Sequence, residues 1–265
     1  MSTAAPGLKL RLPSYVVIPA RLASTRLPRK LLLAETGKPL IQHTYEAARR
    51  ATRPFGLCVA TDSDEIARAV RSFGGKAVLT SANLASGTDR VAEVALDLVD
   101  IEIVVNVQGD EPELSGAAID EVIALLEADP TAVMATLATP IRDRKKLDDP
   151  ACVKVVFDSA GRALYFSRAA IPHAREWRDE LLADESPRFF QHLGLYAYRR
   201  EFLSNLAKLP RSPLEQLENL EQLRVLETGN TILVSTVNEP SIGIDTPEDY
   251  REFVERTRRA TRAAG

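Results

Sequence analysis

The 265-residue chain is predicted to form an α/β protein with a largely parallel central sheet. In the first half, short runs rich in β-branched residues alternate with stretches that carry apolar residues at helical spacing. This is the pattern of parallel strands joined by crossover helices. After Pro150 the segments CVKVVFD and RALYFSR flank a turn at 158–161, and this pattern predicts an antiparallel hairpin. We therefore expect a mixed sheet with a smaller antiparallel lobe.

The strands expected in the first half cover residues 15–18, 57–60, 76–79 and 101–107. A helix is expected over 64–73, because Ile66, Val70 and Phe73 share one face and two glycines follow as a stop signal. A further helix follows Thr88, which we expect to be its N-cap, since the next apolar residues have helical spacing.

The second half closes with two helices and a strand. Ser212 and Glu215 have the spacing of a capping box, with a proline at the first helical position, and predict a leucine-striped helix to about Glu227. A strand is expected over 231–237. The last helix is expected to start at Thr246. Ligands of such a sheet are expected beyond the carboxyl ends of its strands.

Composition fits a single globular domain. Hydrophobic residues make up 45% of the chain, and the net charge of −3 creates no overall basic field that would attract nucleic acid. No apolar run reaches the roughly 18 residues of a membrane span, and the N-terminus lacks the apolar stretch of a signal peptide, so we expect a cytoplasmic protein. Cys58 and Cys152 lie in apolar runs and are expected to be buried free thiols.

Domain boundaries follow from the same composition. We expect residues 1–14 to form a flexible N-terminal extension, residues 15–255 to form the domain, and the Arg- and Ala-rich residues 256–265 to form a fraying tail.

A cationic loop follows the first strand. The segment IPARLASTRLPRK places Arg21, Arg26, Arg29 and Lys30 among small and hydroxyl residues. Small side chains let backbone N–H groups approach phosphate oxygens, while Arg and Lys supply charged donors. The alternative is a solvated basic loop without a ligand. The position of the segment at the end of a strand disfavours this alternative. The Walker spacing and G-x-G-x-x-G are both absent, so neither a P-loop nor a dinucleotide site is predicted.

Two acidic residues follow predicted strands at other points of the chain. Asp110 comes after the buried strand VVNVQG, and Asp245 is the third residue of the segment GIDTPEDY, in which Thr246 and Asp249 already satisfy a capping box. Carboxylates at strand ends could converge on one Mg²⁺, which prefers one or two carboxylates plus phosphate oxygens. A turn or capping role remains the alternative for Asp110, and Glu111 could serve only to support it.

The segment SGTDR, residues 86–90, lies at the boundary between a loop and a helix. A helix start attracts anions through its free N–H groups, so a contact with nucleotide oxygens and a plain cap are equally compatible with this segment.

Together these segments resemble the KDO cytidylyltransferases, also called CMP-KDO synthetases, from Tyr15 to about Glu255. The resemblance rests on a series of motifs in the order of that family: VVIPARLASTRLPRK, ATDSDEIARAV, SGTDR, VVNVQGDEP, MATLATPI, CVKVVFD, ALYFSRAAIP, QHLGLYAYR, SPLEQLENLEQLRVLE and GIDTPEDY. It implies a Rossmann-like fold of the nucleotide-diphospho-sugar transferase type. It also implies a homodimer, a sugar-binding and dimerisation lobe around 150–210, and the Mg²⁺-dependent reaction of CTP with 3-deoxy-D-manno-octulosonate (KDO) to CMP-KDO and pyrophosphate.

The resemblance also implies site residues. The catalytic residues would be Arg26, Lys30, Asp110 and Asp245, of which Asp110 and Asp245 would bind the metal. The nucleotide would contact Ala20, Arg21, Arg26, Lys30, Ser86, Gly87 and Gln108. The sugar would contact Arg168, His192, Gly194, Tyr196, Glu215, Glu218 and Gln222.

Some of these sugar contacts have structural alternatives. Tyr196 could be a strand aromatic, His192 a core histidine, and Glu215 a capping residue alone. Arg168 is favoured, because a guanidinium binds the carboxylate of a sugar acid with two parallel hydrogen bonds. Glu218 lies three and four residues from Glu215 and Gln222, so these residues could form one polar stripe on the helix.

The chain departs from the family pattern at Arg29 and Leu31, where glycine and proline are common, so we expect a stiffer and more cationic loop. Three other functions remain open: activation of 8-amino-KDO, activation of sialic acid, and nucleotide binding without catalysis. The sialate enzymes carry a glycine-rich first loop, which counts against the second. An amino sugar differs by one group, which one or two side chains could distinguish.

Overall fold

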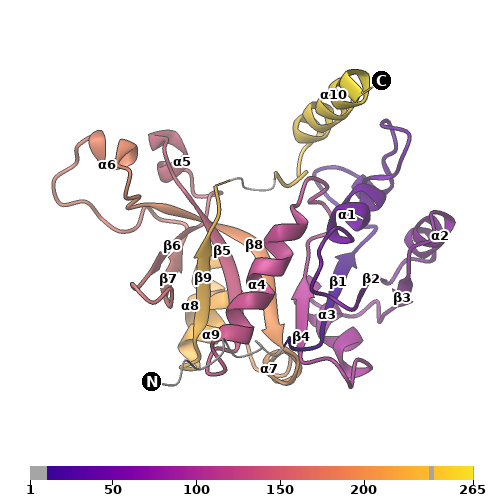
Figure 1. Ribbon diagram of the computed structural model, residues 1–265, viewed down its shortest axis with the longest axis horizontal. Helices are drawn as coiled ribbons and strands as arrows, with labels where there is room; N and C mark the ends of the chain where they lie inside the picture. The colour runs from indigo at the N-terminus through magenta and orange to yellow at the C-terminus, as the bar shows by residue number, and fades with distance from the viewer. Residues whose placement is uncertain (1–10, 239–241, 265) are drawn as a thin grey trace, which may run out of the picture.

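The computed structural model describes residues 11–238 and 242–264, so most of the expected N-terminal extension lies outside the described residues (Figure 1). The strands are β1 (Ser14–Ala20), β2 (Gly56–Thr61), β3 (Ala77–Leu79), β4 (Ile103–Asn106), β5 (Met134–Pro140), β6 (Lys154–Phe157), β7 (Ala163–Ser167), β8 (Phe190–Arg199) and β9 (Ile232–Thr236). The α-helices are α1 (Leu40–Ala48), α2 (Asp64–Ser72), α3 (Gly87–Leu96), α4 (Gly116–Ala128), α5 (Arg144–Asp148), α6 (Glu180–Ala183), α7 (Arg200–Leu206), α8 (Pro213–Glu218), α9 (Gln222–Glu227) and α10 (Pro247–Ala264), and a 3-10 turn covers Lys30–Leu32.

The described strands form one mixed sheet in the order β3-β2-β1-β4-β8-β5-β9. Its pairs β1–β2, β1–β4, β2–β3 and β5–β9 are parallel, whereas β8 runs antiparallel to both β4 and β5. The hairpin β6–β7 joins β8 through Lys154 opposite Gln191 and lies with α5 and α6 at one side of the molecule (Figure 1). The expected fold class, a largely parallel sheet with an antiparallel lobe, is confirmed.

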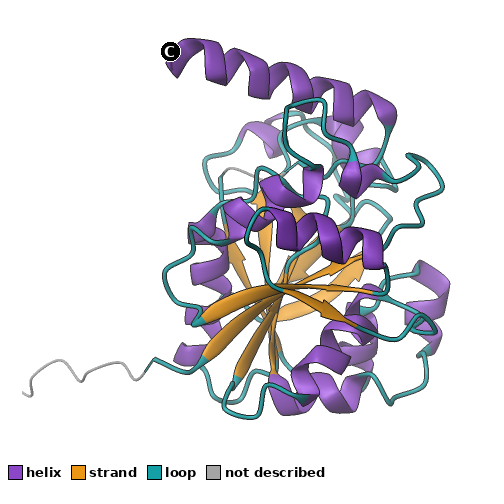
Figure 2. Cartoon of the chain, turned by 90° about the vertical axis from the view of Figure 1, so that its right-hand side faces the viewer, coloured by secondary structure: helices purple, strands orange, loops and turns teal. Residues whose placement is uncertain are grey.

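Helices cover both faces of the sheet, as Figure 2 shows. Side chains of a strand point alternately to its two faces, so Val16 belongs to a core cluster that includes residues of α1, α2, α4 and α10, while Val17 belongs to one that includes residues of α3, α7 and α9. Both faces of β1 are therefore buried, which explains why its sequence is an apolar run without alternation. Among the helices that the structure describes, none combines the length and apolar character of a membrane span.

Most expected elements are present with shifted ends, including both strands of the hairpin and the helix expected over 64–73. Cys58 and Cys152 are buried and free, as expected. Thr88 is not the N-cap of α3; Ser86 is, because its hydroxyl accepts a hydrogen bond from the backbone N–H of Asp89.

Two expectations about helices were wrong. The helix expected from Ser212 to Glu227 is two helices, α8 and α9, because Asn219 adopts a left-handed backbone conformation with φ of 52°. Asparagine tolerates this conformation, which ends a helix. The residues expected to form a C-terminal tail instead continue helix α10 as far as Ala264.

Candidate active site

Two cavities open at the carboxyl ends of the strands. The first, which we call the cationic cavity, has a volume of about 380 Å³. Its lining comes from the loop after β1, the residues after β4 and the start of α3: Pro19, Arg21, Ala23, Ser24, Thr25, Arg26, Lys30, Leu31, Gly87, Gln108, Gly109, Asp110 and Asp245. The second, the β8 cavity, has a volume of about 390 Å³, and β8 supplies more of its lining than any other element, with further residues from the segment that leads into α4. Asp245 lines both cavities, so they adjoin at its side chain.

Lys30 lines the cationic cavity and joins its two carboxylates. Its Nζ contacts Asp110 Oδ2, lies 3.1 Å from Asp245 Oδ1, and donates to the carbonyl of Ile244 at 2.8 Å. Arg26 reaches the same oxygen of Asp245 at 3.0 Å. The expected meeting of the two carboxylates beside the cationic loop is therefore confirmed, although these carboxylates lie far apart in the sequence.

Local structure leaves both carboxylates free for these contacts. Asp249 caps α10 by accepting from the backbone N–H groups of Asp245 and Thr246 at 3.0 and 2.8 Å, so Asp245 needs no capping role. The backbone N–H of Ile244 donates to the carbonyl of Asp110 at 2.9 Å and joins the two segments. A side chain at Gly109 would place Cβ 2.9 Å from the carbonyl of Pro19, so only glycine fits there.

The residues present fit a magnesium ion that arrives with phosphates. In residues 11–238 and 242–264, no cluster of three or more His, Cys, Asp or Glu could hold a metal alone. Asp110 and Asp245 provide two carboxylate groups, and Mg²⁺ commonly takes one or two carboxylates and completes its shell with water and substrate phosphate. A metal at this pair would therefore require oxygen ligands from a nucleotide or from water.

The comparisons with known proteins identify the family. The sequence model described as "Cytidylyltransferase" matches residues 15–232. The chain belongs to the cytidylyltransferase family. A 3-deoxy-manno-octulosonate cytidylyltransferase of Rhodopirellula baltica is 53% identical over 242 residues, which are 91% of this chain and 97% of that protein. An 8-amino-3,8-dideoxy-manno-octulosonate cytidylyltransferase of Shewanella woodyi is 47% identical over 239 residues, 89% of this chain and 95% of that protein.

A solved structure supports the same family. A CMP:2-keto-3-deoxy-manno-octonic acid synthetase in complex with CTP superposes with a TM-score of 0.86 and is 40% identical. The match covers 94% of this chain and 99% of that chain, so the family fold extends over nearly all of the molecule.

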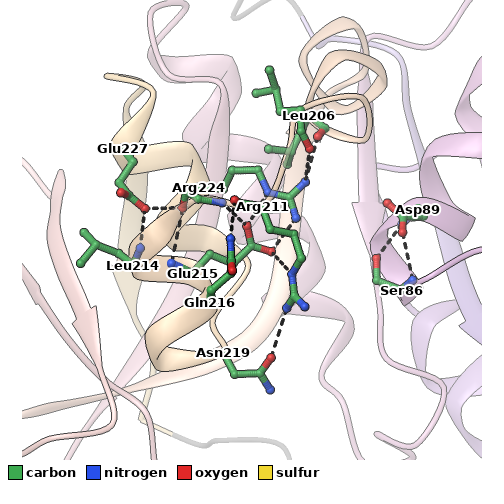
Figure 3. Close-up of polar contacts among 12 residues, drawn as sticks. Ser86, Asp89, Leu206, Arg211, Leu214, Glu215, Gln216, Asn219, Arg224 and Glu227 are labelled. Carbon is green, nitrogen blue, oxygen red and sulfur yellow. Dashed lines mark hydrogen bonds and ion pairs between the residues drawn. The ribbon is translucent and has the colours of Figure 1, made fainter.

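The cytidylyltransferase places most of the expected nucleotide residues around the cationic cavity. Arg21, Gly87 and Gln108 line it, and Arg21 also donates to the carbonyl of Leu84 at 2.9 Å. Ala20 and Ser86 do not line it. Ala20 is buried at the end of β1, and Ser86 forms a reciprocal capping box with Asp89, shown in Figure 3.

Arg29 also lies outside the lining of the cationic cavity. It has a left-handed φ of 56°, and its guanidinium pairs with Glu65 at the start of α2. A left-handed backbone suits the glycine that is common in the family at this position. In this chain the arginine there forms an ion pair with helix α2 instead.

Four expected sugar residues gather around the β8 cavity: His192, Gly194, Tyr196 and Gln222. A smaller cavity of about 230 Å³ is lined by residues of both cavities, with Gly87 and Gln108 on one side and Tyr196 and Gln222 on the other. The smaller cavity therefore shares lining residues with both the cationic cavity and the β8 cavity, which also adjoin at Asp245.

Glu215 is not a sugar residue, which corrects the expectation. Its side chain is fully buried, and its carboxylate accepts from Arg224 Nε at 2.6 Å and from Arg211 Nε at 3.2 Å (Figure 3). It also accepts from the backbone N–H of Ser212 at 3.2 Å and completes the capping box. Burial opposes the charge of this carboxylate, but the two guanidinium groups lower its pKa overall. Its role is structural.

Arg168 and Glu218 are likewise absent from the linings of both main cavities. Glu218 accepts from Ser167 Oγ at 2.6 Å and from the backbone N–H of Arg168 at 3.0 Å. The Arg168 guanidinium donates to the carbonyls of Glu218 and Pro150 at 2.8 and 3.1 Å. In this arrangement the pair fastens the end of β7 to α8 and contacts neither cavity.

Several lining residues were not predicted as sugar or nucleotide contacts. Glu111 lines the β8 cavity, and Glu221 lines the smaller connecting cavity beside Gln222. Ser24 and Thr25 line the cationic cavity within the loop that the sequence had already indicated. The sequence did not indicate that Glu221 lines a cavity, because the helix break at Asn219, just before α9, was not predicted.

His192 makes the stability of the cytidylyltransferase sensitive to acid. Burial lowers the pKa of this imidazole from 6.5 to about 3, so only the unfolded chain takes up its proton between these values. The unfolded state is favoured as the pH falls below 6.5. We expect the free energy of unfolding of the wild type to fall by about 1 kcal/mol more than that of His192→Gln between about pH 7 and about pH 5.5. Urea unfolding at both pH values measures this, and parallel losses in the two proteins would contradict it.

Proposed function

We propose that this cytidylyltransferase transfers the CMP group of CTP to KDO, forming CMP-KDO and releasing pyrophosphate. The observation that carries the proposal is the position of Asp245, which lines the cationic cavity on one side and the β8 cavity on the other. Relatives named as 3-deoxy-manno-octulosonate cytidylyltransferases and a related synthetase solved with CTP support the two substrates.

The two cavities divide the substrates between them. Arg21, Arg26 and Lys30 provide the positive charge that a triphosphate requires, and Gly87 and Gln108 lie at the side of the nucleotide. The β8 cavity offers imidazole, phenol and amide groups to the hydroxyls of the sugar acid. This arrangement would place the innermost phosphate of CTP near Asp245, where the cavities adjoin.

The proposed step is an in-line displacement at the α-phosphorus. The anomeric hydroxyl oxygen of the sugar forms a bond to the α-phosphorus, the bond from this phosphorus to the bridging oxygen of pyrophosphate breaks, and the hydroxyl proton passes to solvent. Lys30 and Arg26 would neutralise charge on the phosphates and orient them. Bound magnesium would lower the pKa of the hydroxyl and offset charge on the leaving group, and Asp110 and Asp245 would hold it.

The substrates are tested with a panel. We expect pyrophosphate release from CTP with KDO, and at least about ten-fold lower kcat/KM with UTP, ATP or GTP, with 8-amino-KDO and with sialic acid. Faster turnover of 8-amino-KDO would assign the chain to the activity named for the Shewanella relatives. No pyrophosphate with any pair would indicate a nucleotide-binding protein without catalysis.

Metal binding is expected to depend on the nucleotide. Without CTP, the Lys30 ammonium already pairs with both Asp110 and Asp245, and an incoming cation must compete with it. The phosphates of CTP would draw Lys30 away and add oxygen ligands. We expect Mn²⁺, as a substitute for Mg²⁺, to bind at least about ten-fold more tightly to the protein with CTP than without it. Electron paramagnetic resonance of free Mn²⁺, corrected for Mn²⁺ bound by CTP in solution, measures this difference, and equal affinities would contradict it.

Three further properties belong to the same proposal. We expect a homodimer formed through the lobe around residues 150–210, a cytoplasmic location, and a role in lipopolysaccharide biosynthesis. The family resemblance supports the homodimer and the biosynthetic role, and the apolar pattern of the sequence supports the location. The molar mass in solution tests the first.

A further inference from the structure

A single hydroxyl group links the irregular part of β8 to β5. Thr136 in β5 is fully buried, and it lies opposite Tyr196, whereas the next residue of β5 lies opposite Leu193. Residues 194–195 are therefore extra in β8 and form a bulge. Thr136 Oγ1 lies 3.0 Å from the carbonyl of Leu193 and 2.9 Å from that of Leu195, so it bridges the two ends of the bulge.

The same oxygen also contacts His192. The distance from Thr136 Oγ1 to His192 Nε2 is 3.0 Å, and both groups are buried. Thr136 Oγ1 thus has three polar neighbours at hydrogen-bond distance, but a hydroxyl group has one hydrogen to donate.

The donors and acceptors around Thr136 Oγ1 favour one arrangement of that hydrogen. The carbonyl oxygens of Leu193 and Leu195 can only accept, so all three contacts are favourable only when the hydrogen of Thr136 points toward these carbonyls. In that arrangement the ring nitrogen of His192 is the donor, and its N–H points at the Thr136 oxygen. Burial keeps the imidazole neutral by lowering its pKa, so the ring carries one proton and its other nitrogen carries a lone pair.

We propose that Thr136 is a positioning residue for the sugar: its hydroxyl fixes His192 as the Nε2–H tautomer and leaves Nδ1 as a hydrogen-bond acceptor for a substrate hydroxyl. The part of this proposal that concerns the sugar rests on the proposed function. Thr136 does not line the β8 cavity, whereas His192 and the bulge residue Gly194 do. Its effect on the substrate is therefore transmitted through these two residues.

Two variants separate the hydroxyl from the bulk of the side chain. Thr136→Val removes the hydroxyl and keeps the branched shape, while Thr136→Ser keeps the hydroxyl and serves as the matched control. The tautomer is read from the ¹⁵N shifts of the imidazole nitrogens in ligand-free protein. The chain has three histidines, so His192→Gln assigns the signal.

We expect the Nε2–H tautomer in the wild type and in Thr136→Ser, and loss of this preference in Thr136→Val. We further expect Thr136→Val to raise the KM for KDO about ten-fold, with the KM for CTP changed less than about two-fold, and Thr136→Ser to behave as the wild type. An Nδ1–H tautomer in the wild type would overturn the proposal without any variant. An equal rise of both KM values in Thr136→Val would also overturn it, because this is the result of general loosening.

The tautomer measurement does not need turnover. If the protein released no pyrophosphate from CTP and KDO, the proposed function would fail while the tautomer would still be measurable. If turnover were normal and the tautomer were the opposite one, only the role of Thr136 would be rejected.

Discussion

Replacing Asp110 or Asp245 by asparagine is expected to lower kcat by at least about 10³-fold and to leave the fold intact. Each change removes one of two carboxylates that meet at Lys30, and with it a charge that the proposed metal requires. Both side chains are partly exposed at the rim of the cavities, so the expected cost in stability is small. Pyrophosphate release measures kcat, and far-ultraviolet circular dichroism checks the fold.

Asp100→Asn is the matched control for this experiment. Asp100 is exposed and precedes β4 at the amino end, opposite the end from which the chain leads to Asp110. We expect this variant to keep the activity of the wild type. A folded Asp110→Asn or Asp245→Asn protein with more than about a tenth of wild-type kcat would rule out the carboxylate pair as catalytic.

Replacing Glu215 by alanine is expected to lower the free energy of unfolding by about 3–5 kcal/mol. The carboxylate is fully buried and receives two hydrogen bonds from Arg224, whose own side chain is only 12% exposed. Its removal leaves the Arg224 cation buried without its anionic partner, and it also removes the hydrogen bond from the Ser212 N–H that completes the capping box of α8. Urea or thermal unfolding at neutral pH measures the loss.

Glu248→Ala provides the comparison. Glu248 pairs with Arg251 on the exposed surface of α10, and pairs of this kind contribute at most about 1 kcal/mol. A similar small loss in Glu215→Ala would show that the buried pair does not stabilise the region of α8 and α9. A large loss would explain why Glu215 is fixed by the fold and is unavailable to a sugar.

The strands and caps that depend on local patterns were predictable from the sequence. Apolar runs gave β1, β2 and β4, the turn at 158–161 gave the hairpin, and the Thr246–Asp249 box gave the start of α10. The insertion of β8 between β4 and β5 was not predicted, because its pairing partners are distant in sequence and no local signal reports strand order. The left-handed turn at Asn219 was missed because the leucine pattern continues across it.

The site shows the same division. The sequence showed that Thr246 and Asp249 suffice to cap the last helix, so that Asp245 has no capping role, and the structure agrees. The sequence also showed that Asp110 follows a buried strand. The contact of these two carboxylates through Lys30 depends on the assembled sheet. Glu215 was assigned to the sugar wrongly because its partner, Arg224, lies on the next helix, and helical spacing alone does not reveal a buried ion pair.

Phosphorus NMR of the protein mixed with Mg²⁺, CTP and KDO tests the central claim most directly, because it identifies both products. The account predicts that the three signals of CTP disappear while one phosphodiester signal and pyrophosphate grow in equal molar amounts. Formation of CDP and inorganic phosphate, formation of free CMP as the first product, or unchanged CTP would contradict the transfer of CMP to the sugar.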